Sequence, residues 1–281
     1  MVRRNFADRI AETGVNIQKE FQRIFTLFYE ETIESRKSYY DKIVHCIDRR
    51  FRELPSSNRA LSLEDFDNYY GYNFHDVTNP TLDDLIDICE YCFNFAYEYR
   101  ELSYNRTTGR YECPRAIHYL LVEISDVIDA IGYFPVKYNK QTIFVEKSPA
   151  AVSASEVLDG DVAIETLLYN HHSMKGDLVG KRKTLAQMAN WLEPKRGELK
   201  ELDKELEGTL FFLFNRYSIR HNNEEEGNHF NPQMQNISKK ELEEIYDDTY
   251  QLWLLAVLTL DNKERKAKYG TMKNESKALK N

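Results

Sequence analysis

Apolar residues recur at intervals of three and four along most of the chain, a spacing that predicts amphipathic α-helices. The first such stretch spans residues 6–53, where Ile17, Phe21, Ile24 and Phe28 share one stripe. Further helical stretches are expected within residues 62–80, 82–104, 114–131, 161–171, 178–192, 195–219 and 238–260. The pattern therefore predicts a chain built almost wholly of helices.

Residues that cap helices stand where these stretches begin or end. Thr81 precedes the helix at 82–104, and Pro114 and Gly132 bracket the helix between them. Ser238, followed three residues later by Glu241, has the spacing of a capping box. These residues support the helix boundaries independently of the hydrophobic pattern.

Residues 134–147 break the helical spacing, because apolar and polar positions nearly alternate around Asn139-Lys140. That alternation predicts a small β-hairpin. The fold class expected from the whole pattern is all-α, with a helical N-terminal region, a C-terminal helical bundle and this one small hairpin.

A run of small residues at 149–155 is the best candidate for a hinge between two halves, and the boundary is expected near residues 148–160. From Asp261 onward the sequence is polar and rich in lysine, which favours a frayed or disordered tail over residues 263–281. The predicted organisation is a helical N-terminal region (residues 1–150), a C-terminal helical domain (160–262) and the tail.

Composition narrows the classes of function. The 281 residues are 42% hydrophobic, enough for a substantial core, and the net charge of −8 argues against a surface coated by nucleic acid. No run of about 18 apolar residues is present, as a membrane span would need. The N-terminus lacks the apolar segment of a signal peptide. We therefore expect a cytoplasmic protein without a membrane partner and with reduced cysteines.

Cys89 and Cys92 have the spacing of half a zinc site, which Cys113 and His118 could complete. Both members of the pair lie within an apolar helical run, however, where a cysteine behaves as a small hydrophobic residue. A structural role in the core is therefore preferred, and the sequence predicts neither a metal site nor another cofactor.

Residues 215–223, Asn-Arg-Tyr-Ser-Ile-Arg-His-Asn-Asn, carry the candidate chemistry and are called the Arg–His segment below. Arg216 and Arg220 are four apart, so on a helix they would share one face. Arginine binds phosphate through paired hydrogen bonds, and His221 can exchange a proton near neutral pH. The alternative is a helix cap, in which the basic side chains neutralise the last carbonyl groups of the helix.

An arginine–histidine pair placed between two long helices resembles the HEPN domain over roughly residues 160–262. The motifs at 169–171, 175–177, 193–194 and 219–223 are similar to those of abortive-infection phage-resistance proteins of the AbiJ-like group. The resemblance implies a metal-independent endoribonuclease in a HEPN-like helical bundle. It also implies that residues 1–150 form a sensing or regulatory region.

Carried onto this chain, the resemblance assigns catalysis to five residues: Arg220, His221, Arg216, Asn222 and His229. It assigns substrate binding to Asn215, Asn223, Lys175 and His171. Two registers stay open, Arg216 with His221 or Arg220 with His229. In either register the 2′-OH of RNA attacks the adjacent phosphorus while histidine transfers protons and arginine stabilises the developing charge.

The resemblance further implies RNA as substrate, a homodimer in which the two Arg–His segments face each other, and a phage-encoded trigger. Cleavage of host RNA during infection would then halt growth. The alternative function is a non-catalytic helical module that binds a phage component, a toxin or RNA. In that case the Arg–His segment would serve as a helix cap or a phosphate anchor.

Overall fold

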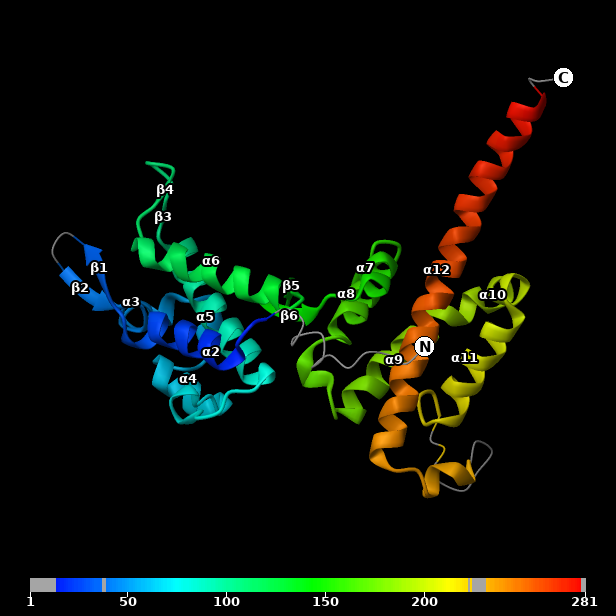
Figure 1. The fold of residues 1–281 in the computed structure, drawn as a ribbon, viewed down its shortest axis with the longest axis horizontal. Helices are drawn as coiled ribbons and strands as arrows, with labels where there is room; N and C mark the ends of the chain where they lie inside the picture. Colours follow the sequence, from blue (N-terminus) through cyan, green and yellow to red (C-terminus); the bar gives the residue numbers. More distant parts are fainter. Residues whose placement is uncertain (1–13, 37–38, 222, 224–230, 279–281) are drawn as a thin grey trace. The chain divides into compact units, whose positions relative to one another are not determined.

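The computed structural model describes residues 14–36, 39–221, 223 and 231–278, and these are mostly helical (Figure 1). The all-α fold class is therefore confirmed. The chain divides into two compact units, residues 1–146 and 147–281, and each is described by itself. Among the described residues, no helix has both the length and the apolar character needed to cross a bilayer.

Unit 1 is organised around the long helix α5, which contacts α2, α6 and strand β6. Its α-helices are α2 (Ile17–Phe25), α3 (Ile43–Asp48), α4 (Leu63–Tyr70), α5 (Leu82–Leu102) and α6 (Arg115–Ala130). Shorter turns are the π-helical η1 (Thr26–Glu30) and the 3₁₀ turns η2 (Phe51–Glu53), η3 (Pro55–Ser57) and η4 (Phe74–Asp76). The predicted start of α5 is confirmed, since Thr81 and Asp84 form a reciprocal capping box.

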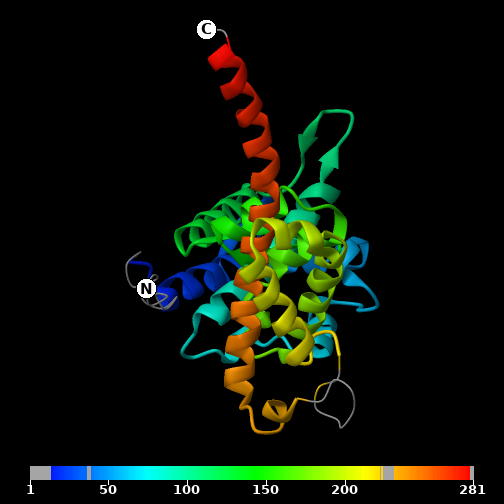
Figure 2. The same ribbon diagram turned by 90° about the vertical axis from the view of Figure 1, so that its right-hand side faces the viewer.

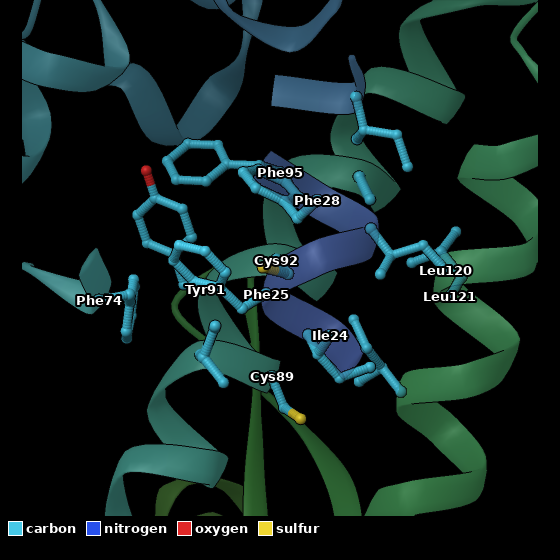
Figure 3. Close-up of a cluster of buried hydrophobic side chains, with 14 of the residues drawn as sticks. Ile24, Phe25, Phe28, Phe74, Cys89, Tyr91, Cys92, Phe95, Leu120 and Leu121 are labelled. Atoms are coloured by element: carbon cyan, nitrogen blue, oxygen red, sulfur yellow. The ribbon is translucent and has the colours of Figure 1, made fainter. Parts of the chain in front are cut away.

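The core of unit 1 is rich in aromatic side chains (Figure 3). Phe25 and Phe28, from α2 and η1, lie beside Tyr91 and Phe95 of α5, with α6 on the other side of α2. The rings of Tyr91 and Phe95 meet edge to face, with 4.9 Å between their centroids. Aromatic pairs in this geometry add attraction beyond the area that they bury.

The predicted hairpin at 134–147 is confirmed as strands β5 (Tyr133–Tyr138) and β6 (Gln141–Glu146). Its turn uses Asn139 and Lys140, both with positive φ, as a tight two-residue turn requires. Asn94 of α5 anchors the hairpin, because its amide accepts from the Thr142 N–H and donates to the Thr142 carbonyl, both at 2.7 Å.

The expectation of helix over residues 6–53, of which residues 6–13 fall outside the described part of the chain, is wrong in its middle. After η1 the backbone becomes extended at Glu31, and an antiparallel pair follows, β1 (Thr32–Arg36) with β2 (Tyr39–Lys42). The β-branched residues Thr32 and Ile33 favour this change, because branching at Cβ restricts side chains in a helix. A third two-stranded ladder, β3 (Tyr104–Asn105) with β4 (Arg110–Tyr111), closes the polar loop after α5.

Unit 2 is a helical bundle whose core is formed by α7, α9, α10, α11 and the first half of α12 (Figure 2). Its α-helices are α7 (Pro149–Ser155), α8 (Gly160–Leu168), α9 (Leu178–Leu192), α10 (Arg196–Leu202), α11 (Lys204–Arg216) and α12 (Lys239–Ala278). The 3₁₀ turns are η5 (His172–Met174), η6 (Glu193–Lys195) and η7 (Pro232–Gln235). Trp253 is fully buried at the centre, and its indole N–H donates to the Met188 carbonyl at 3.2 Å.

Three expectations for unit 2 require correction. Residues 149–155 form helix α7, capped by Ser148, because Ala151 and Ala154 pack into the core. The expected helix at 195–219 is two helices, since Asp203 is extended and caps α11 by accepting from the Leu206 N–H. The tail is helical as far as Ala278, because α12 continues through it without a break, and residues 279–281 fall outside the described part of the chain.

Candidate functional site

The Arg–His segment begins where α11 ends, and asparagine side chains satisfy the last carbonyl groups of that helix. Asn223 Nδ2 donates to the Asn215 carbonyl at 2.9 Å, and Asn231 Nδ2 donates to the Arg216 carbonyl at 2.8 Å. The Tyr246 hydroxyl of α12 donates to the Tyr217 carbonyl at 3.1 Å. Side chains of Asn223, Asn231 and Tyr246 thus cap the end of α11.

Asn223 also fixes the turn that follows the helix. Its Oδ1 accepts from the Ser218 N–H at 2.8 Å, while its own N–H donates to Ser218 Oγ at 3.3 Å. Ser218 has a φ of 56°, in the left-handed region that turns the chain sharply. Ile219 is buried at 3% exposure, so the segment is tied to the core next to Arg220 and His221.

Arg220 points toward the end of α9, where its Nη1 donates to Glu193 Oε2 at 2.5 Å. The side chains of Arg220 and Glu193 are 23% and 41% exposed, so the pair lies at the edge of the surface. A guanidinium has five N–H donors, and this contact leaves further donors on Arg220 for a phosphate. Glu193 therefore orients Arg220 and partly neutralises it.

The two arginines do not share a helix face, contrary to the sequence expectation. Helix α11 ends at Arg216, whereas Arg220 lies in the irregular turn beyond it. Arg216 is exposed in the last turn of the helix, and His221 is half-buried next to Arg220. The remaining two candidates, Asn222 and His229, fall outside the described residues.

The four residues expected to bind substrate occupy different environments. Asn223 is fully buried and its amide serves the turn, while Asn215 is half-buried and offers its carbonyl to Asn223. His171 caps η5, with its Nδ1 2.7 Å from Ser173 Oγ, and Lys175 is exposed just beyond. Gly176, next to Lys175, donates its N–H to Glu243 of α12, so residues 171–176 lie along the first turns of that helix.

A partly buried polar cluster beside residues 171–176 was not identified from the sequence. Lys181 is only 4% exposed, and its Nζ lies 2.8 Å from Glu243 Oε1 and 2.7 Å from Asp247 Oδ1. The Tyr169 hydroxyl donates to the same Asp247 oxygen at 3.0 Å. Lys181 precedes Thr184, Leu185 and Met188 at helical spacing, which is the signal that places it on the buried face of α9.

The surroundings shift the pKa values of two groups in this cluster. Burial of Glu243 acts to raise its pKa, but hydrogen bonds from Lys181 and from the Gly176 N–H outweigh burial, and the pKa lies below the ordinary value. Burial raises the pKa of Tyr169, and the nearby carboxylate of Asp247 raises it further. Tyr169 is therefore a neutral hydrogen-bond donor, and Glu243 is ionised near neutral pH.

The cysteine pair of unit 1 lies in the core, as the preferred interpretation expected. Cys89 and Cys92 have no exposed surface, and burial raises the pKa of both thiols. Zinc binds the thiolate form, which this environment disfavours. Cys113 and His118 lie together elsewhere, with 3.5 Å between Sγ and Nε2.

Comparison with known proteins assigns the chain to no family. No family model, no curated protein and no solved structure matches it.

Proposed function

We propose that this chain is an abortive-infection antiphage protein that cleaves RNA at the Arg–His segment without a metal ion. The observation that carries the proposal is that Arg220 and His221 lie in the irregular turn just beyond α11, within five residues of Arg216 at the end of that helix. The backbone of that turn is fixed by Asn223 and Asn231. These asparagines cap α11, and Arg220 and His221 lie in the turn that follows, close in sequence to the exposed Arg216. Preorganised cations of this kind stabilise charge at a phosphoryl centre.

The proposed reaction is an intramolecular transesterification of the RNA backbone. The 2′-oxygen attacks the adjacent phosphorus as its proton passes to His221, and the bond from phosphorus to the 5′-oxygen breaks as that oxygen receives a proton. Arg216 and Arg220 stabilise the charge that develops on the phosphorane oxygens. One product then ends in a 2′,3′-cyclic phosphate and the other in a 5′-hydroxyl.

The cellular part of the proposal rests on the resemblance to HEPN-containing resistance proteins. In this proposal a cytoplasmic homodimer cleaves host RNA after a phage-encoded trigger reaches residues 1–150. Growth then stops before phage multiply. Symmetric dimers are the commonest oligomers, which makes a two-copy enzyme a reasonable assembly.

The experiment that tests this function combines a purified and a cellular readout. Full-length protein is incubated with single-stranded RNA in EDTA, and the product ends are identified by mass spectrometry. We expect cleavage with 2′,3′-cyclic phosphate ends, and slowed growth when the protein is overproduced. Cleavage that EDTA stops and magnesium restores contradicts the metal-independent mechanism. If neither cleavage nor growth arrest is observed, the proposal that the protein is a ribonuclease is contradicted.

The alternative, a non-catalytic binding module, is favoured by one observation. Glu193 occupies a donor of Arg220, as in a structural ion pair. Under this alternative, alanine at Arg220 or His221 changes binding or stability but no RNA is cut. A gel-shift assay with uncleaved RNA, run beside the cleavage assay, separates the two functions.

A further inference from the structure

A groove on unit 2 lies beside the Arg–His segment and has acidic walls. Tyr217, Ile237 and Ile245 form its apolar part, and the carboxylates belong to Glu241, Glu244 and Asp248 of α12. The three acidic residues follow one another at intervals of three and four, so they share one side of the helix. Their negative charge opposes the approach of a polyanion such as RNA to this part of the surface.

The same side of α12 continues beyond the bundle with the opposite charge. Leu255 lies midway along it and is 51% exposed. About three turns later comes Lys266, which is exposed on the same side, with the exposed Arg265 at the edge of that side. Tyr269, 62% exposed, follows about one turn further on. One strip of a single helix is thus acidic near its start, apolar in the middle and basic toward its end.

The basic half of this strip lies beyond the bundle core. Among the side chains of α12 whose burial is described, Leu260 is the last buried one, and those from Asn262 onward are exposed. Figures 1 and 2 show α12 continuing past α10 and α11. Lys263 reaches back to Glu198 of α10 at 2.9 Å, but the helix extends for several more turns. Most stability of such a helix comes from packing against a partner.

We propose that the partner is a second copy of this chain, paired antiparallel through α12 so that each basic half fills the acidic groove of the other. A two-fold axis at the level of Val257 places Asp248 opposite Lys266, because each is nine residues from that point. Glu244 then faces the turn that carries Tyr269, and the Leu255 side chains lie near the axis. Tyr269 supplies apolar surface for Ile237 and Ile245.

Charge complementarity selects this occupant. Parallel pairing would set acidic residues against acidic residues, whereas antiparallel pairing sets opposite charges against each other at both ends. The interface is isologous, so two copies satisfy both grooves and the assembly closes as a dimer. Arg265 also pairs with Asp261 of its own chain at 2.7 Å, which holds its guanidinium on the outer part of α12.

This pairing has a consequence for the site, which rests on the proposed function. The phosphate-binding surface is then formed by residues of both copies. The partner's basic residues neutralise the acidic groove next to Arg216, Arg220 and His221, which gives RNA a path to the Arg–His segment. Two equivalent positions at Glu244 lie ~40 Å apart along the pair, from the rise of 1.5 Å per residue. Each Arg–His segment therefore meets the partner's α12, not the partner's Arg–His segment.

Charge reversal on the full-length chain tests the pairing without RNA. Molar mass is measured by light scattering for wild type, for Glu244→Lys/Asp248→Lys and for Arg265→Glu/Lys266→Glu. We expect a wild-type dimer that weakens in high salt, and a monomer for each double variant alone. An equimolar mixture of the two double variants should restore the dimer. The chain that carries all four substitutions should also dimerise by itself. Lys200→Glu/Lys204→Glu, on exposed positions of α10 and α11, is the matched control and should stay dimeric.

A monomeric wild type overturns the proposal, as does a dimer that survives both reversals. Failure of the mixture to restore the dimer, with circular dichroism showing both variants folded, overturns it equally. The cleavage assay on the same samples separates the two ideas. A dimer that cuts no RNA keeps the pairing and contradicts the ribonuclease, whereas an active monomer does the reverse.

Discussion

Arg220 donates a hydrogen bond from Nη1 to Glu193 Oε2 at 2.5 Å, joining the turn after α11 to the end of α9. The two residues are 27 positions apart in sequence and meet at the edge of the surface. An ion pair in this position holds the guanidinium in one place and lowers its attraction for a phosphate. Glu193 is therefore a positioning residue for Arg220 in the proposed reaction.

Changing Glu193 to Gln removes that negative charge and keeps a hydrogen-bond acceptor. If Arg220 binds phosphate, Glu193→Gln should tighten RNA binding a few-fold. The salt dependence of binding should hardly change, because only the ion pair between Glu193 and Arg220 is altered. Cleavage should fall if the precise orientation matters more than charge. Binding isotherms and single-turnover rates at two salt concentrations measure both effects, with Glu198→Gln as control. Identical binding in wild type and variant argues against phosphate contact by Arg220.

His221→Ala tests proton transfer. The expected loss of cleavage rate is about 10²–10⁴-fold, the usual contribution of general acid–base catalysis. Arg220→Ala should lower the rate at least as much, and Arg220→Lys should rescue only partly, because lysine lacks the planar fork. The comparison is made on melting temperature and phage protection in the same variants. A His221→Ala protein that still protects cells removes this histidine from the mechanism.

Asn223→Ala separates the support of the turn from its chemistry. The variant leaves the Asn215 carbonyl and the Ser218 N–H without their partners, which should lower the free energy of unfolding by about 1–3 kcal/mol. Asn223→Asp keeps the acceptor for Ser218 but buries a carboxylate against the Asn215 carbonyl, so its cost should be at least as large. Urea denaturation checks this order. Equal stability of wild type and Asn223→Ala would show that the cap is not needed.

Lys181 and Glu243 predict a dependence of stability on pH. The pKa of Glu243 is lowered in the folded protein, so its contribution is present above the ordinary glutamate value of 4.5 and is lost as the pH falls through the folded value. Wild type should therefore exceed Glu243→Gln in melting temperature at pH 7, and the difference should shrink in acid. A difference that grows as the pH falls contradicts this assignment.

Lys181→Met examines the other side of the same cluster. The substitution leaves Glu243 and Asp247 close together without their cation, at a cost of about 2 kcal/mol. That figure lies below the 3–5 kcal/mol of a fully buried pair, because both carboxylates remain partly exposed. Lys183→Met, an exposed position on the same helix, is the control. Equal melting temperatures for Lys181→Met and Lys183→Met would show that Lys181 does not stabilise the fold.

The sequence by itself determined the helical class, most helix boundaries and the hairpin at 133–146. These features follow from short-range rules: Thr81 and Ser238 cap helices through residues three positions away, and Asn139-Lys140 is a local turn signal. Periodicity failed at residues 32–36 and 39–42, where the β-branched Thr32 and Ile33 favour extended backbone. It also failed at Asp203. The apolar spacing continues through this residue, but its side chain caps a new helix and the backbone there is extended.

The tertiary structure alone decided what surrounds the candidate residues. The pattern placed Arg216 and Arg220 on one helix, but the chain turns at Ser218, since Asn223 and Asn231 return from later in the sequence to take the last carbonyls of α11. The pairing of Arg220 with Glu193 and of Lys181 with Glu243 and Asp247 joins residues 27 to 66 positions apart. Contacts over such separations depend on how helices pack, and helical spacing records only which face of each helix is buried.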